Sequence, residues 1–194
     1  LTGLHNIRDA FRHPVLRLMF IVIFFNAFGF KFFTDFIQVY IEDAFAFSTF
    51  DSSRYFSFVG ICVAISQGVL LRILSRKMSS KVILLWSIPL LAASIISLLV
   101  PTGVTGLFVI TAILSFAQSM VMPNQVTIIS NATDNQQQGE VLGINQSVMT
   151  LAQALPPLIG GFVLNINSAI PLYLAGGFAI VSWVIYLHYY RIGK

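Results

Sequence analysis

Charge and cysteine are both scarce in this sequence. Asp, Glu, Lys and Arg together make up 9% of the 194 residues, whereas soluble proteins carry about 25%. The single cysteine, Cys62, excludes an internal disulfide framework, and the three histidines show no metal-ligand spacing with it. No phosphate-binding loop or nucleophile motif occurs. We therefore expect no metal site, no bound cofactor and no enzyme activity.

Apolar residues, in contrast, make up 57% of the chain and gather in six long runs. The runs cover residues 16–41, 55–74, 82–100, 107–130, 140–164 and 170–190. Each is near or above the roughly 20 residues that a helix needs to span a bilayer. The runs are continuous and do not alternate with polar residues, which favours helices over barrel strands. The sequence therefore predicts an all-α membrane protein with six transmembrane helices.

The formal net charge is +4, but the basic residues stand in short clusters beside the apolar runs. This placement indicates membrane topology and not a nucleic-acid partner, because cytoplasmic loops carry the excess of Lys and Arg. Most basic residues lie on the side of the membrane that the two chain ends share: Arg8, Arg12, Arg17, Arg72, Arg76, Lys77, Lys81, Arg191 and Lys194. The other side has Arg54 alone. We therefore predict a multi-pass integral membrane protein with both termini in the cytoplasm.

The first run holds the charges that lie deep within an apolar segment, Lys31 and Asp35. A separation of four residues places both side chains on one face of a helix. A charge at such depth costs about 3 kcal/mol on insertion scales, so it normally faces a protein interior or a water-filled cavity. Two hypotheses follow. The pair is a structural ion pair that holds this helix to its neighbours, or it is a proton-coupling pair in a transport pathway.

Polar side chains also follow three-and-four spacing on the runs 55–74, 107–130 and 140–164. Such stripes occur at ordinary contacts between membrane helices. Together with the stripe on the first run, however, they favour a shared polar cavity, with the runs 82–100 and 170–190 as an outer scaffold. The candidate cavity-lining residues are Asn26, Gln38, Gln67, Gln118, Gln125, Asn145, Gln146 and Gln153.

This arrangement resembles the C-terminal half of a major facilitator superfamily transporter. The loop after the second run is similar to the cytoplasmic signature Gly-x-x-x-Asp-Arg-x-Gly-Arg-Lys of that family: Gly68, Arg76 and Lys77 match, while Arg72 and Ser75 replace its Asp and second Gly. The segments 122–124 (Met-Pro-Asn) and 138–147 (Gln-Gly-Glu-Val-Leu-Gly-Ile-Asn-Gln-Ser) resemble the tenth-to-eleventh helix region of drug:proton antiporters, including tetracycline-efflux-like proteins. The opening segment 6–14 also resembles drug:proton antiporters.

The resemblance implies two inverted three-helix repeats in residues 15–194, preceded by the end of a cytoplasmic linker in residues 1–14. The chain opens at Leu1 and not at methionine, so we expect a fragment or a processed piece. The implied function is proton-coupled export of a hydrophobic or amphipathic small molecule across a bacterial inner membrane, with the proton gradient as energy source. The implied partners are the lipid bilayer, the substrate, and an N-terminal six-helix half or a second copy. Two alternatives stay open: an uptake permease in which Lys31 binds an organic anion, and a stand-alone half that dimerises or scaffolds without transport.

The fifth run carries further candidates at its two ends. Glu140 opens it, where a carboxylate meets the positive end of the helix dipole. Near the outer end, Pro156 and Pro157 are followed by two glycines, and we expect them to interrupt the helix. The interruption is either a bend that serves as a gate or an ordinary packed kink.

Overall fold

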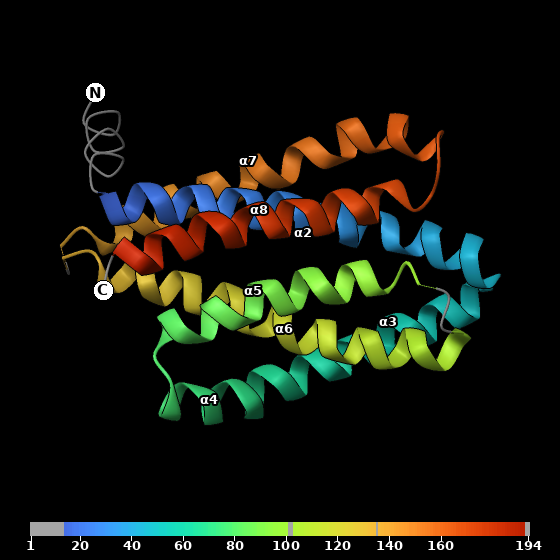
Figure 1. Ribbon diagram of the computed structural model, residues 1–194, viewed down its shortest axis with the longest axis horizontal. Helices are drawn as coiled ribbons and strands as arrows, with labels where there is room; N and C mark the ends of the chain where they lie inside the picture. Colours follow the sequence, from blue (N-terminus) through green and yellow to red (C-terminus); the bar gives the residue numbers. More distant parts are fainter. Residues whose placement is uncertain (1–13, 101–102, 135, 193–194) are drawn as a thin grey trace.

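The computed structural model describes residues 14–100, 103–134 and 136–192, which form long helices joined by short turns (Figure 1). The elements are α2 (Pro14–Phe45), α3 (Thr49–Ile65), the π-helical turn η1 (Ser66–Leu70), α4 (Leu71–Lys77), α5 (Ser80–Ser97), α6 (Gly103–Asn131), α7 (Gln138–Leu164) and α8 (Ile170–Ile192). Because α3, η1 and α4 are continuous, they count as one span. Six spans in the described ranges are long and apolar enough to cross a membrane, which confirms the predicted all-α fold. The expected linker, apart from Pro14, and Lys194 lie outside the described residues.

The helix ends differ from the predicted ones because a count of apolar residues ignores the polar turns at the membrane surface. α2 continues beyond residue 41 to Phe45. α3 begins at Thr49, ahead of the predicted residue 55, because a capping box starts it there. In this box the hydroxyl of Ser48 accepts a hydrogen bond from the amide of Asp51 at 3.3 Å. The Asp51 carboxylate in turn accepts one from the amide of Ser48 at 3.1 Å.

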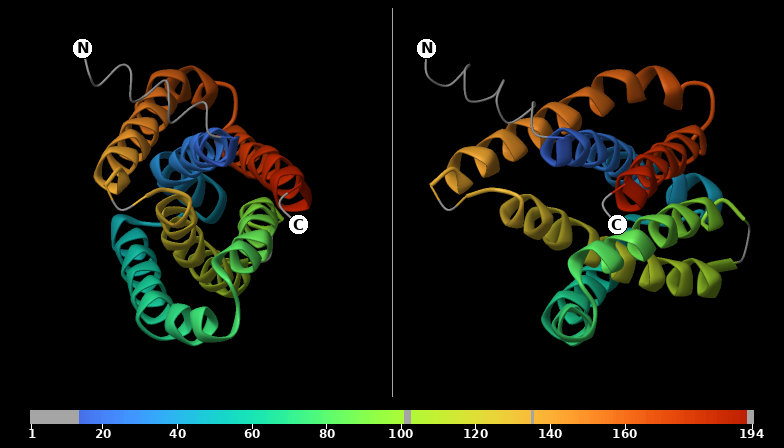
Figure 2. Two further views of the ribbon diagram at one scale, coloured as in Figure 1. Left: turned by 90° about the vertical axis from the view of Figure 1, so that its left-hand side faces the viewer. Right: turned by 60° about the vertical axis from the view of Figure 1, so that its left-hand side comes forward.

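The helix contacts have the symmetry that two inverted three-helix repeats require. The first repeat is α2, α3–α4 and α5, and the second is α6, α7 and α8. α2 packs most extensively on α8 and α7, and α6 packs correspondingly on α5 and α3. The third helices, α5 and α8, also pack on each other. Figure 2 shows α2 and α6 near the middle of the bundle, α5 and α8 on one side, and α7 and α3–α4 at opposite edges.

Close packing around α2 depends on phenylalanine rings and on two glycines. The rings of Phe28 and Phe178 meet edge to face with 4.7 Å between their centroids. At Gly29 a methyl group would lie 2.8 Å from Cβ of Phe178, so only glycine lets α8 approach this closely. On the α7 side, a methyl group at Gly160 would lie 1.8 Å from Cζ of Phe36. The glycine that follows the proline pair therefore allows the α2–α7 contact.

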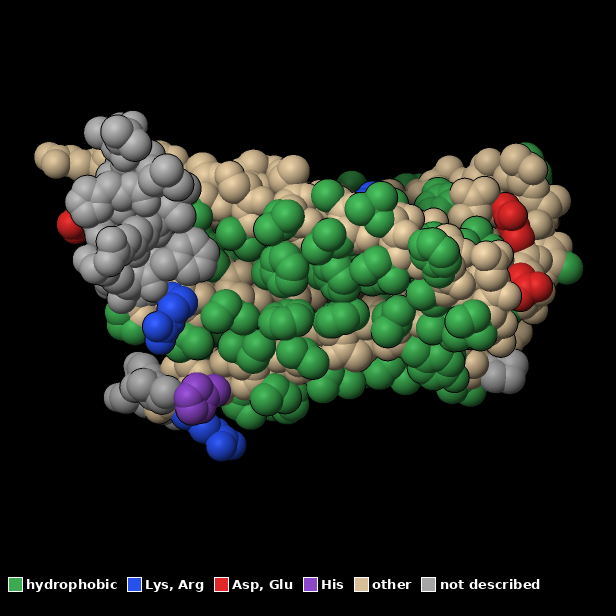
Figure 3. Space-filling view, turned by 90° about the horizontal axis from the view of Figure 1, so that it is seen from above, with side chains coloured by type: hydrophobic (Ala, Val, Ile, Leu, Met, Phe, Trp, Pro, Cys, Tyr) green, Lys and Arg blue, Asp and Glu red, His purple; other side chains and the backbone are tan. Residues whose placement is uncertain are grey.

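Charged side chains gather at the two ends of the bundle. Figure 3 shows a face whose middle is covered by apolar side chains, with Lys, Arg and His towards the end where α2 begins and α8 ends. Asp and Glu side chains lie mainly at the opposite end of this face, and acidic atoms are also visible at the edge of the basic end. The apolar band has the character expected of a surface in contact with lipid.

Candidate functional site

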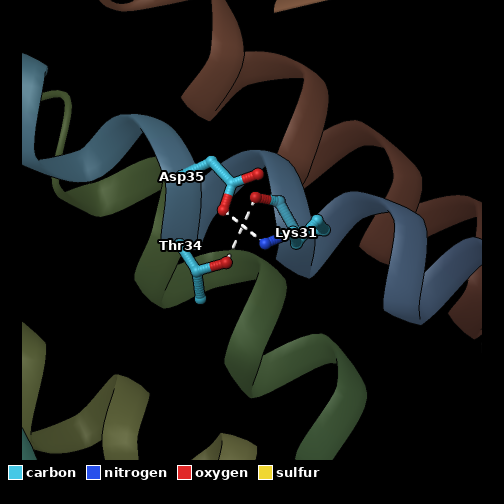
Figure 4. Close-up of polar contacts among 3 residues, drawn as sticks. All are labelled: Lys31, Thr34 and Asp35. Carbon is cyan, nitrogen blue, oxygen red and sulfur yellow. Dashed lines mark hydrogen bonds and ion pairs between the residues drawn. The ribbon is translucent and has the colours of Figure 1, made fainter. Parts of the chain in front are cut away.

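The centre of the candidate site is an ion pair near the middle of α2. Lys31 Nζ lies 2.6 Å from Asp35 Oδ1 (Figure 4). Thr34 Oγ1 donates a hydrogen bond of 3.2 Å to the backbone carbonyl of Lys31. The two charged side chains are 33% and 23% exposed, so neither is sealed in the core. The geometry confirms that both side chains share one helix face, and their functional role stays a prediction.

Beside the pair, a pocket of about 280 Å³ opens between α2, α6 and α7. Its polar lining residues are Asn26, Lys31, Thr34, Gln118, Gln125 and Gln153. Its apolar lining residues are Ile23, Ala27, Phe30, Met122 and Met149. The pocket thus brings together five of the predicted site residues from three helices. Helices α5 and α8 contribute none of these lining residues.

Three amide side chains in this pocket each have one atom without a hydrogen-bond partner among the described residues. These atoms are Nδ2 of Asn26, Oε1 of Gln118 and Nε2 of Gln125. Asn26 and Gln125 are each only 4% exposed. A buried polar atom without a partner costs about 1–3 kcal/mol, so such atoms normally face water or a ligand. The side chains that line the pocket thus carry amide atoms to which the described residues supply no polar contact.

Asn124 shows that burial alone does not leave an amide unpaired. This residue precedes Gln125 and is 3% exposed, yet its side chain donates a 2.6 Å hydrogen bond to the backbone carbonyl of Met120. Asn124 is thus satisfied within α6 and does not line the pocket. The unpaired state of Gln125 is specific to the helix face on which it lies.

Other predicted cavity residues lie outside this pocket. Gln38 is exposed and donates to Oε1 of Glu42 at 2.9 Å. Gln67 is exposed in the π-helical turn, and Gln146 is exposed on α7. Asn145 is buried but not in the lining, and its Oδ1 has no hydrogen-bond partner within the described part of the chain. Whether these residues border a larger cavity stays a prediction.

The expected interruption of the fifth run is wrong. α7 continues as one helix from Gln138 to Leu164 with both Pro156 and Pro157 inside it. A membrane helix tolerates proline where neighbouring helices and local adjustments satisfy the freed carbonyls. Glu140 lies in the first turn of α7, as the sequence predicts. A gating role for Glu140, or for the end of α7 that holds Pro156 and Pro157, stays a prediction.

The family signature lies on an exposed segment. Arg76 and Lys77 form the last turn of α4, and Gly68 lies in η1. All three residues are exposed, and a methyl group at Gly68 would meet nothing within 4 Å. The structure therefore gives no packing reason for this glycine, and a gating role of the loop stays a prediction.

Sequence reasoning missed the apolar lining residues Ile23, Phe30 and Met149. Of these, Met149 could have been found. Its spacing was a usable signal, because Asn145, Met149 and Gln153 follow one another at four-residue intervals along α7. A search restricted to polar residues passes over an apolar member of the same stripe. Met149 and Met122 give the pocket two flexible, polarizable side chains from different helices.

The fold and the pocket define an α-helical membrane unit built from two inverted repeats around a polar site. Residues 81–193, more than half of the chain, match the Major Facilitator Superfamily. The chain belongs to this family. Among its relatives, Multidrug resistance protein 2 of Bacillus subtilis (strain 168) is 26% identical over 172 residues, which cover 88% of this chain and 42% of the relative. Multidrug resistance protein 1 of the same organism is 22% identical over 162 residues, 84% of this chain and 41% of the relative. The chain thus spans about two fifths of the length of these relatives.

Proposed function

We propose that this chain is the C-terminal half of a secondary transporter that exports hydrophobic or amphipathic small molecules in exchange for protons. The observation that carries the proposal is the pocket between α2, α6 and α7 with the Lys31–Asp35 pair at its edge. The names of the two bacterial relatives support export of drug-like compounds. The energy source in this proposal is the proton gradient, and no bound cofactor takes part.

Proton coupling follows from the chemistry of the pair. Asp35 accepts a proton and loses its charge, so the attraction across the 2.6 Å contact ends and Lys31 is released. The free ammonium then binds other acceptors in the pocket, such as the unpaired Oε1 of Gln118. A proton shifts a conformational equilibrium only if its interactions differ between the states. Release of Lys31 provides such a difference between inward-open and outward-open forms.

The partner in this proposal is a preceding six-helix half. The flanking helices support it, because in the most apolar window of Thr49–Lys77 only 6% of the residues are buried, and 17% in that of α7. Lipid covers part of these surfaces, and the other half of the transporter covers the polar side. A complete alternating-access pathway then lies between the two halves, at the depth of Lys31.

The test uses the complete protein that contains this chain, reconstituted in liposomes. Asp35→Asn should insert and bind substrate but lose nearly all transport driven by a proton gradient. Substrate exchange without a gradient should survive, because it needs no proton transfer. Asp43→Asn is the control: this carboxylate accepts a 2.5 Å hydrogen bond from Ser168 at a position outside the pocket. Its proton-driven transport should stay within about twofold of wild type.

A double variant separates coupling from a purely structural role. Lys31→Met with Asp35→Asn removes both charges, and such a neutral replacement of an ion pair often preserves stability. Under the proposal this protein folds normally but does not couple transport to protons. Normal proton-driven transport by the double variant would remove the pair from the mechanism.

The proposed orientation places both ends of the chain in the cytoplasm of a bacterium, and labelling tests it. In a variant lacking Cys62, a cysteine at Asp51 should react with an impermeant thiol reagent added outside intact cells. Cysteines at Ser79 and Gln137 should react only after the cells are opened. Reaction of Ser79→Cys in intact cells would show that the topology is the reverse of the proposed one.

A further inference from the structure

We infer that the part of the substrate seated against α2, α6 and α7 is uncharged and carries hydrogen-bond acceptors, such as carbonyl or ether oxygens. The inference rests on the proposed function, since it takes this pocket as part of a substrate site. It adds the chemical class of the bound group and the side chains that select it, Asn26 and Gln125.

The charges around the pocket argue against a bound cation or anion. Within the described residues, Lys31 is the one charged lining residue, and no carboxylate lines the pocket. The ammonium of Lys31 is already paired with Asp35 at 2.6 Å. A cationic group would lose its hydration, gain no opposite charge and face this ammonium. An anionic group would have to displace Asp35 from this ammonium. A neutral group avoids both the loss of ionic hydration and the displacement of Asp35.

The unpaired amide atoms define what the neutral group must offer. Nδ2 of Asn26 and Nε2 of Gln125 are donors, both side chains are more than nine-tenths buried, and both residues line the pocket. A ligand that supplies acceptors to these donors removes the cost of leaving them unpaired. The acceptor Oε1 of Gln118 adds a place for one donor of the ligand. Asn124, equally buried but bonded to Met120, shows that this chain can satisfy an amide where no ligand is needed.

The remaining walls fit an apolar body of moderate size. Phe30, Met122 and Met149 come from three different helices, and the volume of about 280 Å³ lies just below the usual range of about 300–1,000 Å³ for ligand pockets. Aromatic and thioether side chains pack on flat or irregular apolar groups and adapt to their shape. The bound group is therefore an aromatic or aliphatic body with one or two acceptor oxygens.

The test compares three naphthalene probes that share one ring system and carry an acetyl, a trimethylammonium or a carboxylate group. Equilibrium binding to the complete protein in detergent is followed by probe fluorescence. The acetyl probe should bind most tightly. Gln125→Met and Asn26→Leu keep the side-chain size but remove the donor, so each should weaken the acetyl probe about three- to tenfold. Neither variant should change binding of the trimethylammonium probe by more than about twofold.

Two matched variants sharpen the result. Asn124→Leu removes an equally buried amide that does not line the pocket, so affinity for all three probes should be unchanged. Gln125→Glu places a carboxylate in the pocket and should tighten binding of the trimethylammonium probe about tenfold, as expected for a new charge pair away from water. Thermal melting identifies any variant that fails to fold, and a second neutral replacement that removes the same donor, Gln125→Leu or Asn26→Met, then takes its place.

Several results would overturn the inference. They are tightest binding of the trimethylammonium or the carboxylate probe, no binding of any probe, or unchanged affinity for the acetyl probe in folded Asn26→Leu and Gln125→Met. The last result would mean that the two amides hold only water. Because binding is measured without a gradient, it is separate from coupling. Selective acetyl binding without proton-driven transport contradicts the proposed function alone, and proton-driven transport with a preference for the cation contradicts this inference alone.

Discussion

The central helix α2 and the flanking helices α3 and α7 have similar hydropathy but very different surroundings. In the most apolar window of each span, 56% of the residues of α2 are buried, against 6% for Thr49–Lys77 and 17% for α7. The mean hydropathies of these windows are 1.8, 1.9 and 1.5. Hydropathy therefore shows that a segment spans the membrane, but it does not show what the segment packs against.

The difference follows from position in the two repeats. α2 is enclosed by α7, α8 and α6, so its phenylalanines pack on protein and its polar stripe borders the pocket. α3 is buried only at Ser52 and Tyr55, close to the start of the helix. α7 touches α2 at Gly160 and leaves Phe162 79% exposed. The described residues thus bury the centre of the bundle and leave much of the surface of α3 and α7 exposed.

Truncation of a phenylalanine should show the largest difference between these regions. Phe32 in α2 is 1% exposed, and Phe162 in α7 is 79% exposed. Phe32→Ala should lower the free energy of unfolding by about 3–5 kcal/mol, because it removes packing and leaves a cavity. Phe162→Ala should change it by no more than about 0.5 kcal/mol. Unfolding of the reconstituted protein in denaturant measures both, and equal losses would contradict the contrast.

Glycine positions should show a smaller difference of the same kind. At Gly29 in α2 an added methyl group would lie 2.9 Å from the backbone oxygen of Ala175 in α8. Gly29→Ala should therefore cost about 1–3 kcal/mol, since the two backbones must separate. At Gly143 in α7 nothing lies within 4 Å. Gly143→Ala should be neutral or slightly stabilising, because alanine favours the helix. A comparable loss at Gly143 would show that α7 packs closely against a helix beyond these residues.

The number of spans and the face of the charge pair could be predicted because both follow from local rules. The length of an apolar run predicts whether it spans the membrane. A separation of four residues places the side chains of Lys31 and Asp35 on one face of a helix. The Major Facilitator family could be recognised from motifs in the second half of the chain, which the matched region contains. The π-helical turn Ser66–Leu70 could not be predicted, because it leaves the hydropathy of the run unchanged.

The pocket could be predicted only in part, because its lining depends on how helices are rotated against one another. Three-and-four spacing identified Gln118 and Gln125 on one face of α6, and both line the pocket. The same spacing gave no sign that Gln146 lies outside this pocket. Nor could the sequence tell that Asn124 bonds to its own helix while its neighbour Gln125 stays unpaired. Each of these outcomes is decided by the neighbouring helix and not by local pattern.

The smallest expected effect concerns the attachment of α3 to the bundle. Thr111 Oγ1 of α6 donates a 3.1 Å hydrogen bond to the hydroxyl of Tyr55, which is 1% exposed. Tyr55→Phe keeps the ring packing but leaves a buried donor without an acceptor, so the free energy of unfolding should fall by about 1 kcal/mol. Tyr173→Phe is the control, because Tyr173 is 59% exposed on α8 and should lose nothing measurable. Denaturant unfolding of both variants measures the difference. If Tyr55→Phe were as stable as Tyr173→Phe, α3 would be held by ring packing alone, and a partner beyond this chain would have to fix the rest of its length.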